Sequence, residues 1–152
     1  MLSICNHIQD EILAIMAKLV LRDISNEVKE AGEFAILADE SKDCRKIEQL
    51  SIVLRYFLHG TAYESFVGFV PMAGLSADDV SSQILCQLES LQLDYKTMLV
   101  GQGYDGASVM SGKHKGVAKV IKDKATFALY VHCHAHRLNL ALVDTVKSVQ
   151  LY

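Results

Sequence analysis

Apolar residues recur at helical spacing along the first 30 positions of the chain. The residues that form this series are Ile4, Ile8, Ile12, Met16, Leu19, Ile24 and Val28. Such spacing produces an apolar stripe on one side of a helix. Gly32 follows the series, and glycine commonly ends a helix. We therefore predict an amphipathic helix over residues 6–31 and treat residues 1–32 as a leading helix that precedes the main domain.

Short apolar runs with strand character follow this helix. "FAILADES" at 34–41 is an apolar run that ends in acids, which is typical of a buried central strand. "IEQLSIVLRYFLHG" and "YESFVGFVPMAG" are rich in β-branched and aromatic residues, and the segment His59-Gly60-Thr61-Ala62 between their strand portions is a hairpin signal. These runs predict three successive strands, of which at least two are antiparallel.

The rest of the chain alternates helices and strands. The pattern predicts a helix at 76–94 with Ser76 as N-cap, a strand at 97–101, a short helix at 115–125, a strand at 127–133 and a last helix at 136–152. No linker or internal repeat interrupts this order. We therefore predict an α/β fold over residues 33–152: a mixed sheet of five strands, the first three antiparallel, flanked by helices.

A glycine motif lies after the fourth predicted strand. Gly101, Gly103 and Gly106 form a GxGxxG, which in dinucleotide-binding proteins cradles a pyrophosphate. That turn normally follows the first strand of a parallel βαβ unit, whereas three strands precede it here. The acid expected to bind the ribose would be Asp123, which falls inside a Lys-rich helical stretch. We expect no nucleotide cofactor, and interpret the glycines as shaping a tight strand-to-helix turn.

The predicted element order is that of a ribonuclease H-like fold. In that fold one acid lies on the first strand and another at the end of the fourth, which correspond here to Asp39 and Asp105. Two convergent carboxylates can bridge divalent cations that activate an attacking oxygen in phosphodiester chemistry. Taken singly, each residue has a simpler interpretation: Asp39 as an acid that caps a loop, and Asp105 as a turn aspartate.

Three motifs in order, "LADESKD", "VGQGYDGASVMSGKHKGV" and "VHCHAHRLNLAL", resemble the transposase core of the hAT superfamily. The nearest likeness is to hAT-derived zinc finger MYM-type proteins. The resemblance covers about residues 30–150. It implies that Asp39 and Asp105 are the first two catalytic acids and hold Mg²⁺ or Mn²⁺. It also implies that Cys133 and His136 form a CxxH element beside the active site, and that the protein is nuclear.

The resemblance also suggests what this chain lacks. The third acid of the family, a glutamate, lies beyond a large helical insertion, and the chain ends at Tyr152, before that insertion. We therefore expect a fragment of a transposase-derived protein that is inactive alone, whose ancestral activity is metal-dependent DNA strand cleavage and transfer. The alternative is a non-enzymatic DNA- or protein-binding regulatory module domesticated from a transposase. The sequence does not separate these two.

The net charge of −3 conceals an asymmetry. Residues 1–95 carry 7 Lys and Arg against 15 Asp and Glu, whereas residues 96–152 carry 8 against 3. The basic part suits an anionic partner. We expect weak, non-specific DNA binding, for which the candidate contacts are Lys113, His114, Lys115, His136 and Arg137. Lys119 and Lys122 are expected on a solvated helix face. The apolar residues of the last helix predict self-association.

The cysteines show no CxxC pair and are interpreted as reduced thiols of an intracellular protein; they are Cys5, Cys44, Cys86 and Cys133. Cys133 and His136 offer two zinc ligands, which is too few for a structural site. We expect Cys133 in the core, with His132 and His134 facing away from it along the strand end. The most apolar stretch, residues 12–21, contains Lys18 and is too short to span a bilayer.

Overall fold

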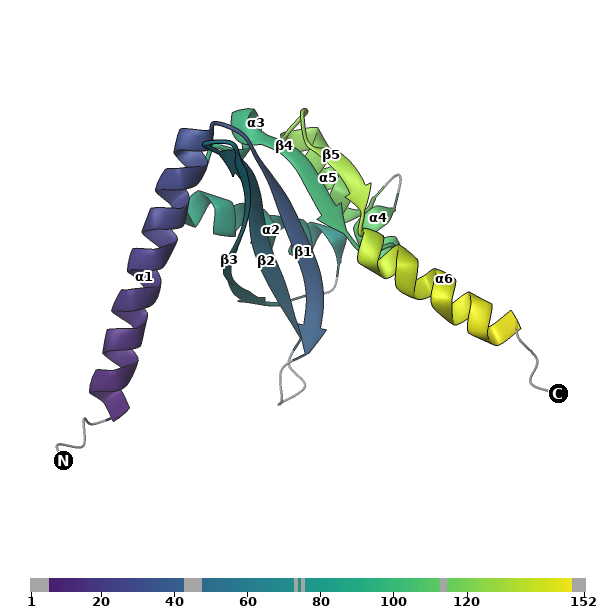
Figure 1. Cartoon of the computed structure of the whole chain (residues 1–152), viewed down its shortest axis with the longest axis horizontal. Coiled ribbons are helices and arrows are strands. Elements are labelled where there is room, and N and C mark those ends of the chain that lie inside the picture. The colour runs from purple at the N-terminus through teal and green to yellow at the C-terminus, as the bar shows by residue number, and fades with distance from the viewer. Residues whose placement is uncertain (1–5, 43–47, 73, 75, 113–114, 149–152) are drawn as a thin grey trace.

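The computed structural model describes residues 6–42, 48–72, 74, 76–112 and 115–148. Its elements are α1 (Asn6–Ala31), β1 (Phe34–Lys42), β2 (Glu48–Leu58), β3 (Thr61–Pro71), α2 (Ala77–Ser90), α3 (Tyr95–Met98), β4 (Leu99–Tyr104), α4 (Ser108–Ser111), α5 (Val117–Lys124), β5 (Leu129–His132) and α6 (His134–Ser148). Figure 1 shows the sheet between α1 and α6, which extend to opposite sides of the molecule. The predicted α/β class, with five strands and a leading helix, is confirmed.

The five strands lie in the order β3-β2-β1-β4-β5. β1 pairs antiparallel with β2, and β2 pairs antiparallel with β3. β4 joins the other side of β1 in parallel, and β5 joins β4 in parallel. The antiparallel arrangement of the first three strands and the central position of β1 were both predicted, and both are confirmed.

Local sequence signals fix several element ends. Gly32 has a φ of +80° and its amide donates to the Val28 carbonyl at 3.1 Å, which ends α1 where predicted. His59 and Gly60 both have positive φ and form the two-residue turn between β2 and β3. Ser76 Oγ accepts the Asp79 amide at 3.1 Å and caps α2. The predicted helix at 76–94 is too long, because α2 ends at Ser90.

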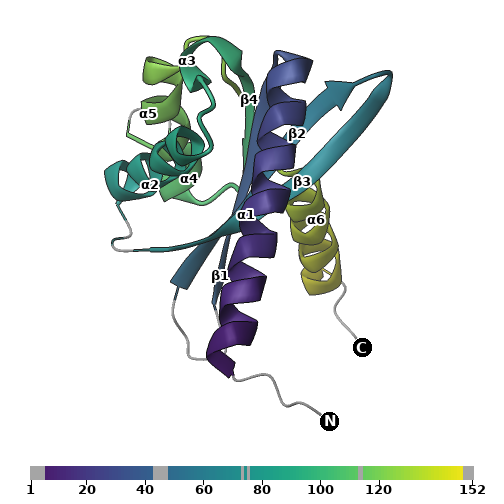
Figure 2. The ribbon, with the colours of Figure 1, turned by 90° about the vertical axis from the view of Figure 1, so that its left-hand side faces the viewer.

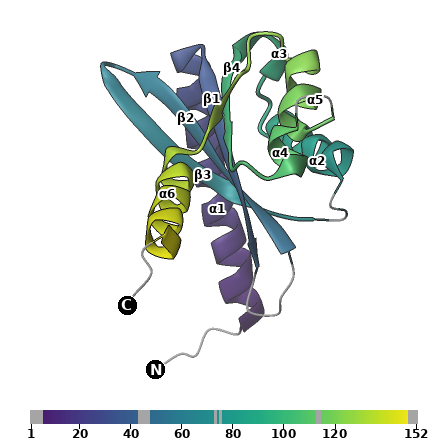
Figure 3. The same cartoon turned by 90° about the vertical axis from the view of Figure 1, so that its right-hand side faces the viewer.

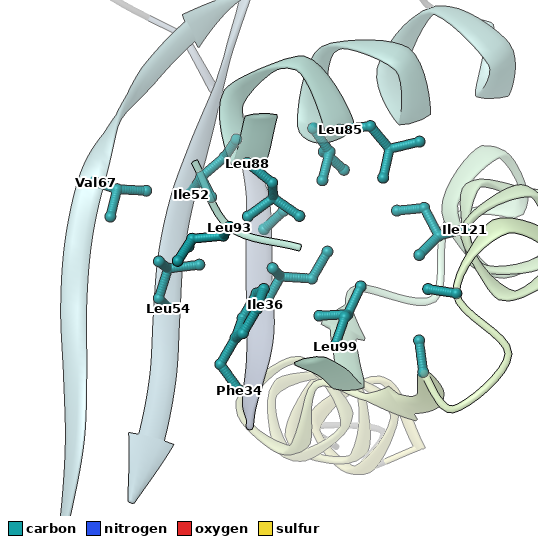
Figure 4. Packing of buried hydrophobic residues seen from close by; sticks show 14 of the residues in the cluster. Phe34, Ile36, Ile52, Leu54, Val67, Leu85, Leu88, Leu93, Leu99 and Ile121 are labelled. Carbon is teal, nitrogen blue, oxygen red and sulfur yellow. The ribbon is translucent and has the colours of Figure 1, made fainter. Parts of the chain in front are cut away.

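One face of the sheet, which we call the core face, carries the hydrophobic core. Phe34 and Ile36 of β1 and Ile52 and Leu54 of β2 are at most 1% exposed. Figure 4 shows them packed beneath α2, whose Leu88 reaches into the same cluster, with α5 alongside. Side chains buried in this way each contribute roughly 1.5–3 kcal/mol, so this layer accounts for most of the stability.

We call the other face of the sheet the open face. It carries Leu37, Asp39, Val53, Phe66, Phe69, Gly103, Leu129 and Val131. Figures 2 and 3 show α2, α4 and α5 on one side of the sheet and α6 on the other, with α6 extending away from the strands. Phe66, Phe69, Leu129 and Val131 are accordingly between 50% and 65% exposed. Among the described residues, the helices include none with the length and apolar character to cross a membrane.

A bulge brings two aromatic rings together on the open face. Residues three positions apart on a regular strand point to opposite faces. The β2–β3 register shifts between Ile52 and Val53, so that Phe66 stands opposite Val53 and Phe69 opposite Ser51. The two Phe rings therefore share a face, with centroids 5.0 Å apart in an edge-to-face arrangement.

Candidate active site at the ends of β1 and β4

Two acidic residues lie at corresponding positions of neighbouring strands. The parallel ladder between β1 and β4 ends at the pair Leu37 and Gly103. Two residues further along each chain come Asp39, still within β1, and Asp105, the first residue after β4. Because side chains alternate along a strand, the register places Asp39 on the open face in line with Leu37, while Asp105 lies just beyond the end of β4. The strand that carries Asp39 and the strand that Asp105 follows are therefore neighbours, as predicted, and the shared metal site stays a prediction.

The surroundings of the two acids differ. Asp39 is exposed, and its backbone carbonyl accepts a hydrogen bond from Ser51 Oγ at 3.0 Å. Asp105 is half-buried; its Oδ1 accepts the Ala107 amide at 3.2 Å and its backbone carbonyl accepts the Tyr130 hydroxyl at 3.0 Å. Asp105 is thus fixed by its turn, as a turn aspartate would be, through its Oδ1 and its backbone carbonyl.

These two carboxylates fit a loosely held hydrated cation. Mg²⁺ is commonly bound through one or two carboxylates, with water completing an octahedral shell. Asp39 and Asp105 offer two carboxylates at neighbouring strands, and their joint use as ligands stays a prediction. Within the described ranges, no group of three or more His, Cys, Asp or Glu side chains is arranged to hold a metal ion.

The glycines of the GxGxxG motif allow close packing at this edge. A Cβ added to Gly103 would lie 2.7 Å from Leu37 Cδ2, and one added to Gly106 would lie 2.6 Å from His132 Cε1. The helix that follows the motif, α4, has only four residues, and the Lys-rich helix α5 begins later, at Val117. The motif therefore brings β4 against β1 and seats the His132 ring over the turn.

The junction between β5 and α6 corrects two predictions. β5 ends at His132, and the Cys133 amide donates to the Tyr104 carbonyl at 2.8 Å, but the Cys133 side chain is exposed. The prediction that Cys133 packs in the core is wrong because no layer of the described structure covers this junction. His134 is the first residue of α6, so His132 and His134 do not alternate along a strand. Instead, His132 lies beside His136, with ring centroids 5.8 Å apart.

The predicted DNA contacts are only partly within the described residues. Lys113 and His114 lie outside them. Lys115 is exposed in the turn before α5, Arg137 is exposed in the first turn of α6, and His136 is half-buried. Lys115 follows α4, and His136 and Arg137 lie in the helix that follows β5. Their role in DNA binding stays a prediction.

Two tyrosines on the strands beside Asp105, one at the end of β4 and one in β5, are features that the sequence patterns did not single out. Tyr104 is fully buried, and its ring lies 6.1 Å from that of Tyr130. Burial raises the pKa of Tyr104 well above its ordinary value. Burial also raises the pKa of Tyr130, and the negative charge of Asp105 adds to this. An aromatic residue in a strand normally indicates core packing. The hydrogen bond from Tyr130 to Asp105 is what distinguishes Tyr130 from an ordinary core tyrosine.

Residues 1–116 match the family model DUF4371, described as the ZMYM1/FAM200, RNase-like domain. This match covers most of the chain, and the chain belongs to that family. The matched region extends from the leading helix through α4 and includes both Asp39 and Asp105.

Two curated relatives are similar to this chain at an identity of 26% and 27%. The human protein "52 kDa repressor of the inhibitor of the protein kinase" is 26% identical over 142 residues, which is 91% of this chain and 18% of the relative. The mouse protein of the same name is 27% identical over 146 residues, which is 93% of this chain and 19% of the relative. The chain thus spans about a fifth of the length of the curated relatives it matches.

Proposed function

We propose that this RNase-like domain is the core of a regulatory protein that descends from a hAT transposase, and that it binds DNA weakly without transferring strands by itself. The observation that supports the proposal is the parallel pairing of β1 with β4, which brings the strand of Asp39 beside the strand that Asp105 follows. The family membership supports an RNase-like origin. The word "repressor" in the names of both relatives supports a regulatory role and, with it, a nuclear location.

Asp39 and Asp105 would hold a Mg²⁺ or Mn²⁺ ion in this arrangement. When bound, such an ion activates an attacking oxygen and stabilises the leaving one in phosphodiester chemistry. The protein's own part is to orient the ligands: the Ala107 amide and the Tyr130 hydroxyl fix Asp105, while Ser51 holds the backbone beside Asp39. Two carboxylates leave most of the coordination shell to water, so we propose weak binding.

A Mn²⁺ titration followed by NMR tests this site. We expect paramagnetic broadening centred on residues 39 and 105, with a dissociation constant in the millimolar range, and we expect Asp105→Asn to abolish it. Asp123→Asn, at an exposed position of α5 where Asp123 pairs with Lys119, is the matched control and should leave the broadening unchanged. Broadening that persists in Asp105→Asn would remove the metal site from the proposal.

A salt titration on short DNA duplexes tests the binding function. We expect affinity that is independent of sequence and falls steeply with salt, because the candidate contacts offer charge for phosphates and no base-reading helix. The double variant Lys113→Glu/Lys115→Glu should weaken binding and lower the salt slope, whereas Lys122→Glu/Lys124→Glu, with the same charge change on α5, should have a smaller effect. Sequence-selective binding that survives physiological salt would instead indicate a dedicated DNA-binding module.

One observation favours a second candidate, a protein-binding module. The open face carries Phe66, Phe69, Leu129 and Val131 with at least half of each side chain exposed. Phe66 and Phe69 lie on one edge strand, β3, and Leu129 and Val131 on the other, β5, and exposed apolar patches commonly mark protein contacts. If the parent chain fails to bind duplex DNA even at low salt, this candidate replaces the first.

A further inference from the structure

The apolar residues of α1 point in two directions. In its C-terminal part, Ser25 and Val28 are buried against the core, and Leu21 and Ile24 are packed against the same cluster. The N-terminal part carries a second series that is 44–63% exposed: Ile8, Ile12, Leu13, Ile15, Met16, Leu19 and Val20. At 3.6 residues per turn the two series lie on largely opposite sides of the helix. Figures 1 and 2 show the N-terminal part extending beyond the sheet.

The exposed series has the spacing of a coiled coil. Ile8, Ile12, Ile15 and Leu19 are separated by four, three and four residues. This places Ile8 and Ile15 at d positions and Ile12 and Leu19 at a positions of a heptad repeat. Short helices gain most of their stability from packing an apolar face, and this part of α1 leaves such a face exposed.

The charges beside this stripe indicate which kind of helix, and in which orientation, is complementary to it. Glu11 and Lys18 are one heptad apart, both at g positions, and carry opposite charges. In an antiparallel pair of identical helices, the g positions of the two copies lie side by side. Glu11 of each copy then faces Lys18 of the other, and Ile12 packs against Ile15 of the other. In a parallel pair, g positions face e positions, and Glu11 would face the apolar Met16.

Glu11 is exposed beside the stripe, where it also pairs with His7 one turn earlier in the same helix. Its carboxylate lies 3.5 Å from His7 Nδ1 in the same helix, and its side chain is 62% exposed. We infer that residues 8–19 of α1 form an antiparallel, two-fold self-association surface, and that its occupant is the same segment of a second copy of this chain.

The other exposed apolar helix, α6, is apolar on more than one side, since Leu140 and Val143 are also exposed, and its longest apolar stripe lacks this complementarity. Leu138, Leu142 and Val146 are spaced four residues apart and form a stripe along α6. Arg137 and Asp144 carry opposite charges, but at 3.6 residues per turn they lie on the far side of α6 from that stripe. The sequence pattern predicts self-association through α6, whereas the charge arrangement favours α1.

Sedimentation equilibrium of the full 152-residue chain at low ionic strength tests the surface. We expect a reversible monomer–dimer equilibrium in the micromolar range, and we expect Ile12→Glu to raise the dissociation constant at least about tenfold. Leu138→Glu, the same change on α6, should leave it unchanged. A parent chain that is monomeric throughout this range, or one dissociated by Leu138→Glu and not by Ile12→Glu, overturns the inference.

Charge reversal tests the antiparallel orientation with variants that leave the apolar stripe intact. Glu11→Lys and Lys18→Glu alone each place like charges together, and each should raise the dissociation constant by about tenfold. The double variant Glu11→Lys/Lys18→Glu restores both pairs and should return to within about threefold of the parent. A double variant that binds no better than the single variants overturns the orientation. Circular dichroism of each variant establishes that the fold is retained.

Discussion

The two faces of the sheet are built from the same strands and have different roles. On β2, Ile52 and Leu54 of the core face are fully buried. On β3, Phe66 and Phe69 of the open face leave half or more of their rings exposed. The core face is covered by α2 and α5, whereas α6 on the other side extends away from the strands. Alternation along a strand thus buries one set of side chains in the core and leaves the other set, which includes Asp39, on the more exposed face.

The largest expected effect comes from truncating one side chain on each face. Ile52→Ala removes a fully buried side chain and leaves a cavity beneath α2, so we expect it to lower the free energy of unfolding by about 3 kcal/mol. Phe66→Ala removes a larger side chain that is already 50% exposed, and we expect a loss below about 1 kcal/mol. Urea denaturation of the two variants measures the difference. Equal losses would show that the open face is packed in solution.

The core face is the part that the sequence predicts well, because its signals are local. The spacing of apolar residues predicted α1 over residues 6–31, and Ser76 marked the start of α2. The order of the elements also predicted that the strand of Asp39 lies beside the strand that ends before Asp105, since only a few sheet topologies join such elements.

The open face was less predictable because its details depend on register. Phe66 and Phe69 share a face only through the shift between Ile52 and Val53, which no local pattern signals. Likewise, the exposure of Cys133 depends on which element covers the end of β5, and the residue type alone favours burial. Sequence therefore indicates which strands carry the acids, while the surroundings of those acids require the structure.

A second, smaller effect concerns the turn that joins β4 to the candidate site. Gly106→Ala would place a Cβ 2.6 Å from His132 Cε1 and 2.8 Å from its Nε2, so the ring must move. His132 Nε2 is buried, and we expect a loss of about 1 kcal/mol. In a His132→Ala background the same change should cost little, because the clash is gone. A double-mutant cycle in urea measures this coupling, and additive losses would show that the ring does not occupy this place.

The smallest expected effect distinguishes two buried tyrosines of the core face. The Tyr104 hydroxyl has no hydrogen-bond partner among the described residues, so Tyr104→Phe should stabilise the fold by about 0.5 kcal/mol at neutral pH. The Tyr56 hydroxyl donates to Glu27 Oε2 at 2.5 Å and lies 3.0 Å from Ser65 Oγ. Tyr56→Phe, which deletes the same atom, should instead destabilise the fold. A destabilised Tyr104→Phe would show that this hydroxyl has a partner in solution.

The pH dependence of Tyr104→Phe provides a second measurement on the same variant. Burial raises the pKa of Tyr104 in the folded state above its ordinary value of 10.0, so the folded protein holds this proton more tightly than the unfolded chain. The corresponding contribution to stability is complete below that value and is lost as the pH rises beyond it. The parent should therefore lose stability in the alkaline range more steeply than Tyr104→Phe, and thermal unfolding from neutral to alkaline pH measures the two slopes. Parallel slopes would mean that Tyr104 is accessible to water in the folded protein and that the core face is not closed around it.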